Sequence, residues 1–220
     1  MEEVATPQDI ECGDQVFDIS FHPENNILAA GLITGEVEVW QYGNEIGANK
    51  KLVSVFCHDG SCRGLQFDRA GDTLYTISSD QCFRGLDGTG KEKFKFKAHD
   101  DKINKLHMLD ENLFATGDDS GCVKLWDIRQ DGSSAVMEWY EHEDFVSAFA
   151  YSEERNTLLS TSGDATIAIY DLKKYGKDSG VQRSDDQEAE LTSVEIIKNG
   201  KKVVCGTQAG VILTFSWGVR

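Results

Sequence analysis

The segment LFATGDDSGCVKLWD, residues 113–127, contains the pattern that decides the fold. A stretch rich in small apolar residues is followed by the polar turn DDSG and then by an alternating stretch that ends in a large aromatic residue. Alternation of apolar and polar side chains is typical of a half-buried strand, and Asp, Ser and Gly cluster in tight turns. The segment therefore predicts two antiparallel strands joined by a tight turn.

The same pattern occurs four more times along the chain. The further copies are ILAAGLITGEVEVWQ at 27–41, TLYTISSDQCFRGLD at 73–87, TLLSTSGDATIAIYD at 157–171 and KVVCGTQAGVILTFS at 202–216. Their large residues are Trp40, Leu86, Trp126, Tyr170 and Phe215, at spacings of 46, 40, 44 and 45. A period of about 40 to 45 residues is that of the WD repeat, which forms one four-stranded β-propeller blade per unit.

We therefore predict an all-β fold, a WD-repeat β-propeller in which five blades are present. The chain forms a single domain, 1–220, and its approximate repeats are 12–56, 57–97, 98–140, 141–185 and 186–220. The polar segment 173–190 is expected to supply only a poor outer strand to the fourth blade.

Loop histidines support this register. His58, His99 and His142 precede the large residue of their copies by 28, 27 and 28 residues, and Asp80 and Asp164 stand six residues before it. Histidine, serine and aspartate are also the residue types of a hydrolase triad. A nucleophile site occurs once, however, whereas these residues recur in register, so we predict buried structural hydrogen bonds and no enzyme.

Two further motifs are weak signals for chemistry. The string GLDGTGK at 85–91 matches the start of a phosphate loop, but Glu92 stands where the motif needs Ser or Thr, so we expect a hairpin turn there. Cys57, His58 and Cys62 lack a second pair of metal ligands. We therefore expect no catalytic, cofactor or metal site.

The charge balance limits the classes of partner. The chain has 22 Lys and Arg against 38 Asp and Glu, a formal net charge of −16, which opposes direct contact with nucleic acid. No apolar run approaches the roughly 20 residues of a membrane span, and the acidic N-terminus lacks the features of a signal peptide. The sequence predicts an intracellular protein with no membrane partner.

Acidic residues follow each loop histidine, and these loops share a propeller face with the turns that carry Asp80 and Asp164. The candidate partner-binding residues on this face are Asp59, Asp100, Asp101, Glu143 and Asp144. Two interpretations remain open: a solvated rim of an acidic protein, or a docking site for a basic tail or an arginine-rich ribosome-assembly protein.

Two long strings carry a closer resemblance. ENLFATGDDSGCVKLWDIR at 111–129 and ELTSVEIIKNGKKVVCGTQAGVILTFSWG at 190–218 resemble the family of WD repeat-containing protein 55, from about Asp9 to Gly218. The resemblance implies a nuclear and nucleolar protein-interaction scaffold that supports ribosomal RNA production, with seven repeats and a basic tail. With five repeats and no such tail, we expect an open arc of a seven-bladed propeller, an exposed apolar flank on blade one or five, and the cytoplasm as an alternative location.

The string WDIR, residues 126–129, suggests a second function. It resembles the WDxR motif through which some WD-repeat proteins dock onto the adaptor of a cullin-based ubiquitin ligase. The resemblance implies that Trp126, Asp127 and Arg129 bind this adaptor, with the arginine supplying the contact. The alternative is a chance match, since Trp-Asp is common in the fold. A substrate receptor of such a ligase is therefore the second functional hypothesis.

Overall fold

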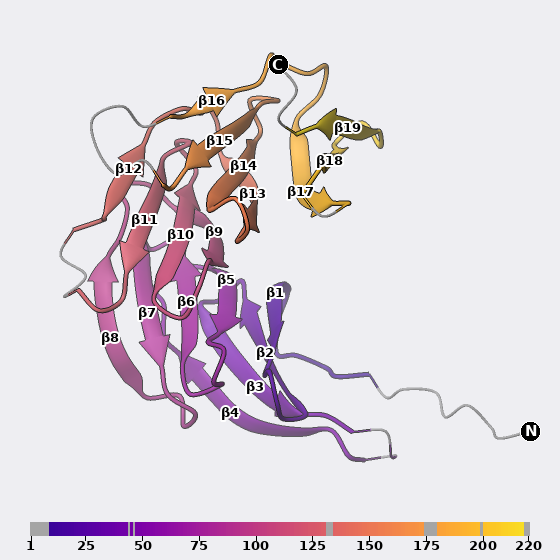
Figure 1. Cartoon of the computed structure of the whole chain (residues 1–220). Coiled ribbons are helices and arrows are strands. Elements are labelled where there is room, and N and C mark those ends of the chain that lie inside the picture. The colour runs from indigo at the N-terminus through magenta and orange to yellow at the C-terminus, as the bar shows by residue number, and fades with distance from the viewer. Residues whose placement is uncertain are drawn as a thin grey trace, which may run out of the picture. The chain divides into compact units, whose positions relative to one another are not determined.

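A computed structural model describes residues 9–43, 45, 47–130, 134–173, 180–198 and 200–217. Every regular element in these residues is a strand, and the strands form five antiparallel sheets (Figure 1). This confirms the predicted all-β fold. Among the described residues, no helix has the length and hydropathy needed to cross a membrane. The chain divides into two compact units, residues 1–103 and 104–220.

The first unit contains two four-stranded sheets, each ordered as in the sequence. The strands of the first sheet are β1 (Val16–Phe21), β2 (Ile27–Leu32), β3 (Glu36–Gln41) and β4 (Lys50–Phe56). Those of the second are β5 (Cys62–Phe67), β6 (Leu74–Ser78), β7 (Cys82–Leu86) and β8 (Glu92–Lys97). The first strands of the two sheets are joined by side chains, since Asp18 Oδ2 accepts the Leu65 N–H at 3.1 Å.

The second unit contains the other three sheets. The third sheet is built from β9 (Ile103–Met108), β10 (Leu113–Asp118), β11 (Val123–Asp127) and β12 (Met137–Trp139). The fourth is built from β13 (Val146–Ser152), β14 (Thr157–Ser162), β15 (Ile167–Asp171) and β16 (Gln182–Arg183). The fifth is built from β17 (Leu191–Ile197), β18 (Lys202–Thr207) and β19 (Ile212–Ser216).

Each sheet lies within one of the five predicted repeats. The expected outer strand in segment 173–190 consists of the two residues of β16, and residues 174–179 of that segment lie outside the described residues. The end of the last repeat, residues 218–220, also lies outside them. The match to a phosphate loop at 85–91 is the turn between β7 and β8, as predicted, because the Asp87 N–H bonds the Lys91 carbonyl at 2.9 Å and Gly90 N–H bonds Asp87 at 2.9 Å.

The cores of both units are formed by sheets packed face to face. In the first unit, Ala29 and Val37 of one sheet pack against Leu65, Leu74 and Leu86 of the next. In the second unit, Ala115 and Val123 pack in the same way with Val146, Leu158 and Tyr170. Small residues on one sheet leave room for the large residue near the end of the third strand of the next, which explains why the repeat alternates between these two kinds of strand.

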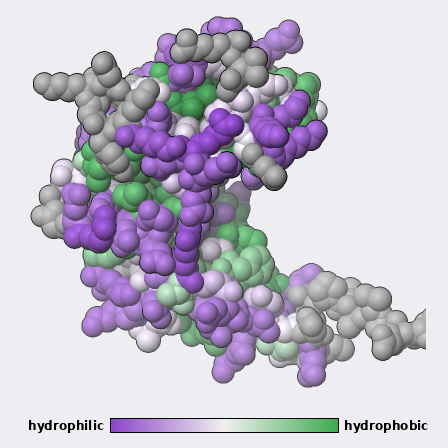
Figure 2. Space-filling model, viewed as in Figure 1, coloured by the Kyte–Doolittle hydropathy of each residue, from purple (hydrophilic) through white to green (hydrophobic). Residues whose placement is uncertain are grey.

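The strand β1 exposes an apolar surface. Val16, Phe17, Ile19 and Phe21 are between 40 and 56% exposed. Figure 2 shows green apolar atoms at the position that β1 has in Figure 1. An exposed apolar flank was expected on blade one or five, and β1 of the first blade has exposed apolar side chains; the open arc stays a prediction.

Candidate functional site

The turn between the second and third strands of each sheet contains a residue in the left-handed backbone region. These residues are Gly35 (φ 84°), Gln81 (69°), Gly121 (87°), Ala165 (66°) and Gly210 (77°), each five positions before the large residue of its repeat. The carbonyl of Gly35 accepts the His58 N–H at 3.2 Å, and that of Gln81 accepts the Ala98 N–H at 2.9 Å. In the first unit these turns therefore hold the loops that contain the repeat histidines.

A buried network ties the first of these loops to the second sheet. His58 Nδ1 lies 3.0 Å from Asp80 Oδ2, and its Nε2 lies 2.9 Å from the Thr76 hydroxyl. Asp80 also accepts the Asp59 N–H at 3.1 Å. Burial acts to raise the pKa of Asp80, but the hydrogen bond and charge of His58 lower it, so the net pKa lies below its usual range. Asp80 thus stays ionised and fixes the backbone on which Asp59 stands.

The fourth sheet contains a longer version of this network. His142 Nε2 lies 2.6 Å from Ser160 Oγ, which lies 3.0 Å from the Tyr170 hydroxyl. His142 Nδ1 lies 3.3 Å from Asp164 Oδ2, and Asp164 accepts the Glu143 N–H at 2.8 Å. Ser160 and Tyr170 are fully buried, so a substrate has no access to the serine oxygen that a hydrolase would use.

The protonation states in this network follow from burial. Desolvation lowers the pKa of His142, although Asp164 acts in the opposite direction. Burial also acts to raise the pKa of Asp164, but hydrogen bonds from the Thr166 hydroxyl and the Glu143 N–H lower it overall. A neutral histidine beside an ionised aspartate is the state that these shifts favour at neutral pH.

The third sheet fills the same turn with different residues. Ser120 occupies the position of Asp80 and Asp164, and Asp118 accepts the N–H groups of Ser120 at 3.0 Å and Cys122 at 2.9 Å. Asp118 is buried and so contributes no accessible acidic surface. The predicted loop histidine of this repeat, His99, is 1% exposed, and its N–H donates to the Gln81 carbonyl.

Two arginines reach the turn aspartates, and the sequence analysis missed both. Arg84 Nη2 lies 3.3 Å from Asp80 Oδ2, and Arg183 Nη2 lies 3.4 Å from Asp164 Oδ2. Arg84 lies on the third strand of its sheet and Arg183 on the fourth, so they share no position in the repeat. Only the folded structure shows their common role.

The predicted acidic residues lie around these anchored loops in both units. Asp59, Asp100, Glu143 and Asp144 are exposed, and Asp101 is half-buried. The side chain of Asp100 is 97% exposed and that of Glu143 is 80% exposed.

Two cationic side chains pair with these acidic residues. Lys97 Nζ lies 2.9 Å from Asp100, and Arg183 Nη1 lies 3.4 Å from Glu143. Exposed pairs of this kind contribute little stability and are screened by salt. The side chains of Asp100 and Glu143 therefore stay largely accessible to solvent even in these pairs.

The WDIR string lies at the other end of the third sheet. β10 and β11 pair Gly117 with Val123 at the turn that holds Asp118, and Leu113 with Asp127 at the opposite end. Trp126 is 4% exposed, and its Nε1 donates to the Thr116 hydroxyl at 2.8 Å. This corrects the assignment of Trp126 as a partner-binding residue, because its ring is buried.

Arg129 remains at the surface, whereas the side chain of Asp127 is only 11% exposed. Arg129 is 67% exposed at its side chain, and its Nε and Nη2 donate to the two carboxylate oxygens of Asp127 at 2.8 and 2.6 Å. This hydrogen bonding lowers the pKa of Asp127 to about 2. The bidentate pair holds the guanidinium in one orientation with part of its surface accessible.

Comparison with known proteins identifies the family of this chain. The profile of the WDR55 family matches residues 7–219. The WD repeat-containing protein 55 homolog of Drosophila virilis is 40% identical over 216 residues, which are 97% of this chain and 42% of that protein. WD repeat-containing protein 55 of Arabidopsis thaliana is 38% identical over 212 residues, 96% of this chain and 58% of that protein. The chain thus spans about half the length of these relatives.

Solved structures of two β-propellers are similar in fold. Saccharomyces cerevisiae Sqt1 superposes with a TM-score of 0.76 at 20% identity, over 92% of this chain and 60% of that one. The WD40 β-propeller domain of Doa1 superposes with a TM-score of 0.78 at 19% identity, over 94% of this chain and 66% of that one. These similarities support the predicted propeller class of fold.

Proposed function

Because the chain belongs to the WDR55 family of WD-repeat proteins, we propose that it is a non-enzymatic interaction scaffold that binds basic ribosome-assembly proteins. It acts in the nucleus and nucleolus, where it supports ribosomal RNA production. The family and the propeller fold support a role as a protein-interaction scaffold in general. The acidic side chains of the loops favour a basic partner.

The proposal rests on one observation. Buried hydrogen-bond networks fix the backbone that carries the exposed carboxylates. Asp80 holds the N–H of Asp59, and Asp164 holds that of Glu143, so an ordered backbone presents each acidic side chain. A fixed array of carboxylates on a chain of net charge −16 attracts a basic segment at long range and loses little entropy when it binds.

Affinity purification from nuclei tests this proposal. The double variant Glu143→Lys/Asp144→Lys places the opposite charge on the loop before β13. Its matched control is Glu153→Lys/Glu154→Lys, which changes the net charge equally in the exposed turn at the other end of β13. Basic pre-ribosomal proteins should co-purify with the wild type and the control and be lost from the loop variant. Equal recovery with all three proteins would contradict the proposal.

A second candidate function rests on Arg129. Its exposed guanidinium, fixed by Asp127, can contact the adaptor of a cullin-based ubiquitin ligase, which would make the chain a substrate receptor. Arg129→Ala should abolish co-purification of the adaptor, and Arg129→Lys should retain little of it, since lysine cannot form the bidentate pair. If the adaptor does not co-purify with the wild-type chain, this function fails.

A further inference from the structure

Arg183 places a guanidinium group against the acidic loop of the fourth sheet. Its Nε donates to the Thr166 hydroxyl at 3.2 Å, its Nη1 lies 3.4 Å from Glu143 Oε1, and its Nη2 lies 3.4 Å from Asp164 Oδ2. Asp186 adds a third carboxylate, with Oδ1 3.9 Å from Nη2. Each of the three guanidinium nitrogens therefore has an acceptor of its own.

This contact differs from the arginine contact of the second sheet. The side chain of Arg84 is 9% exposed and pairs with Asp80 and Glu92. The side chain of Arg183 is 29% exposed, and that of its partner Glu143 is 80% exposed. Arg84 is therefore a buried structural partner, whereas Arg183 neutralises a charge that the loop presents to solvent.

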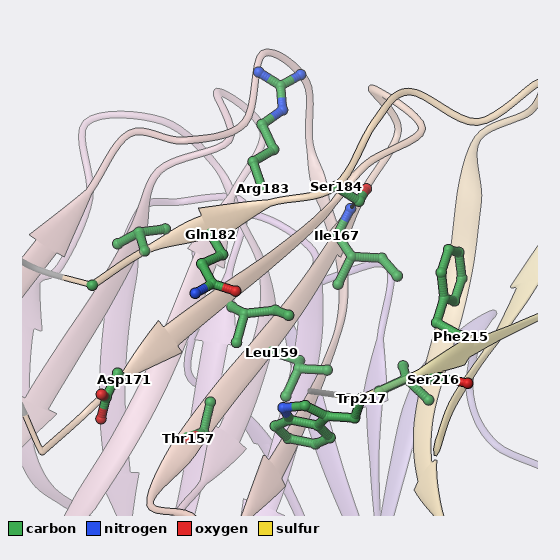
Figure 3. Close-up of a pocket in the computed structure, with 14 residues that line it drawn as sticks. Thr157, Leu159, Ile167, Asp171, Gln182, Arg183, Ser184, Phe215, Ser216 and Trp217 are labelled. Atoms are coloured by element: carbon green, nitrogen blue, oxygen red, sulfur yellow. Dashed lines mark hydrogen bonds between the residues drawn. The ribbon is translucent and has the colours of Figure 1, made fainter. Parts of the chain in front are cut away.

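The guanidinium of Arg183 can leave the loop without disturbing the strand that carries it. Backbone pairing of Gln182 and Arg183 with β15 holds β16, and the Ser184 N–H bonds the Ile167 carbonyl at 2.9 Å. Figure 3 shows the side chains of Gln182 and Arg183 extending in opposite directions from β16. Release of the guanidinium breaks none of these backbone bonds.

We propose that Arg183 is an internal competitor for the acidic loop, and that it occupies the place that an arginine of a partner protein takes on binding. The inference rests on the proposed function, since it concerns the regulation of the same loop. A basic segment that approaches Glu143 is repelled by the positive charge of Arg183 until that side chain turns into solvent. The contact therefore lowers the affinity of the loop for basic ligands.

The acceptors that Arg183 releases favour one kind of basic ligand. A guanidinium from the partner can bond the Thr166 hydroxyl and the carboxylates of Glu143 and Asp164 together, because its nitrogens form a planar fork. A lysine ammonium is a single nitrogen and cannot reach all three acceptors. The loop should therefore bind arginine more tightly than lysine.

An NMR titration that follows one amide measures the occupancy of this loop alone. The probe is the synthetic peptide GRGRGRG, and the signal is that of the Glu143 N–H, which Asp164 anchors. Arg183→Ala removes the competitor and should tighten binding about fivefold, the size expected for loss of an exposed ion pair. Both residues of β16 are exposed, so this variant should retain the fold.

Two matched variants separate the contact from the net charge. Lys201→Ala changes the net charge equally in the exposed turn between β17 and β18, beside Arg155 at the other end of the fourth sheet. It should change the affinity by less than about twofold, since charges this far apart are screened. Arg183→Lys keeps the net charge but bonds fewer acceptors, so it should still tighten binding about twofold. Equal tightening by Arg183→Ala and Lys201→Ala would overturn the inference.

The outcomes separate this inference from the proposed function. Equal affinity of the wild type and Arg183→Ala would show that Arg183 does not compete, while the proposed function would stand. Binding to neither protein, or binding that survives Glu143→Lys/Asp144→Lys, would overturn both. The lysine peptide GKGKGKG should bind Arg183→Ala at least about threefold more weakly than GRGRGRG does. Equal binding of the two peptides would overturn the exchange of one guanidinium for another.

The pKa of His142 reports whether Arg183 lies against the loop in solution. Burial lowers this pKa most, and the positive charge of Arg183 lowers it further. An NMR titration of the imidazole should therefore give a higher pKa in Arg183→Ala than in the wild type, and an unchanged pKa in Lys201→Ala. The same pKa in all three proteins would show that Arg183 does not occupy the loop and would overturn the inference.

Discussion

Nδ1 of His58 lies 3.0 Å from Oδ2 of Asp80, although 22 residues separate them in the chain. The same relationship joins His142 to Asp164, at 3.3 Å and again 22 residues apart. In both repeats the aspartate also accepts the N–H of the residue after the histidine. In each of these repeats one carboxylate therefore anchors both the histidine and the backbone of the residue that follows it.

Removing this carboxylate should cost much more than removing an exposed one nearby. Asp80→Ala leaves His58 and Arg84 without their buried partner and should lower the free energy of unfolding by about 3 kcal/mol. Asp59→Ala, on the exposed loop, should change it by less than about 0.5 kcal/mol. Denaturant unfolding of both variants measures the difference, and equal losses would contradict the anchoring role of Asp80.

The fourth-sheet network should make stability dependent on pH. Burial lowers the pKa of His142 in the folded chain, so below the ordinary value of about 6.5 the unfolded chain binds more protons than the folded one. The contribution of His142 to the free energy of unfolding is therefore fully present above this pH. It falls as the pH decreases, by at most about 1.4 kcal/mol per pH unit for one histidine. Asp164, whose folded pKa is also lowered, adds a loss only below its ordinary value near 3.8.

A variant of His142 isolates its contribution. His142→Gln should unfold more easily at pH 7 but lose less stability between pH 7 and pH 5 than the wild type does. His107, whose pKa burial also lowers, should account for the slope that remains. Denaturant unfolding across this range measures both effects, and an unchanged slope in His142→Gln would show that this histidine is not responsible.

The left-handed turn position predicts opposite effects of two small substitutions. Ala165 has a φ of 66°, so Ala165→Gly should relieve strain and raise the free energy of unfolding by about 0.5 kcal/mol after the entropy cost of glycine. Gly121→Ala should lower it by about 2 kcal/mol or more, because a Cβ would lie 2.6 Å from the His142 carbonyl oxygen. Thermal unfolding of both variants checks these signs, and destabilisation by Ala165→Gly would contradict the strain.

The sheets could be predicted because the residues that pack between them follow the repeat pattern of the sequence. Small residues such as Ala29 and Ala115 and large ones such as Leu86 and Tyr170 must alternate at fixed spacing for neighbouring sheets to fit. The loop histidines followed from the same register. The acidic loops could be predicted with them, since their position relative to the histidine is fixed along the chain.

Other features depend on contacts that the repeat does not encode. Trp126 belongs to a motif expected at the surface, yet its ring is buried and its Nε1 donates to the Thr116 hydroxyl. Gln81 and Ala165 occupy a left-handed position without the glycine that would mark it.

The rate at which a basic ligand associates tests the central claim most directly. Stopped-flow measurements with an arginine-rich peptide should show that Glu143→Lys/Asp144→Lys lowers the association rate constant about tenfold at low salt, whereas Glu153→Lys/Glu154→Lys changes it little. The difference should shrink as salt rises toward 0.15 M, where the Debye length is about 8 Å. Equal rate constants for the two variants would contradict the account, because the loops would then act only through the net charge of the chain.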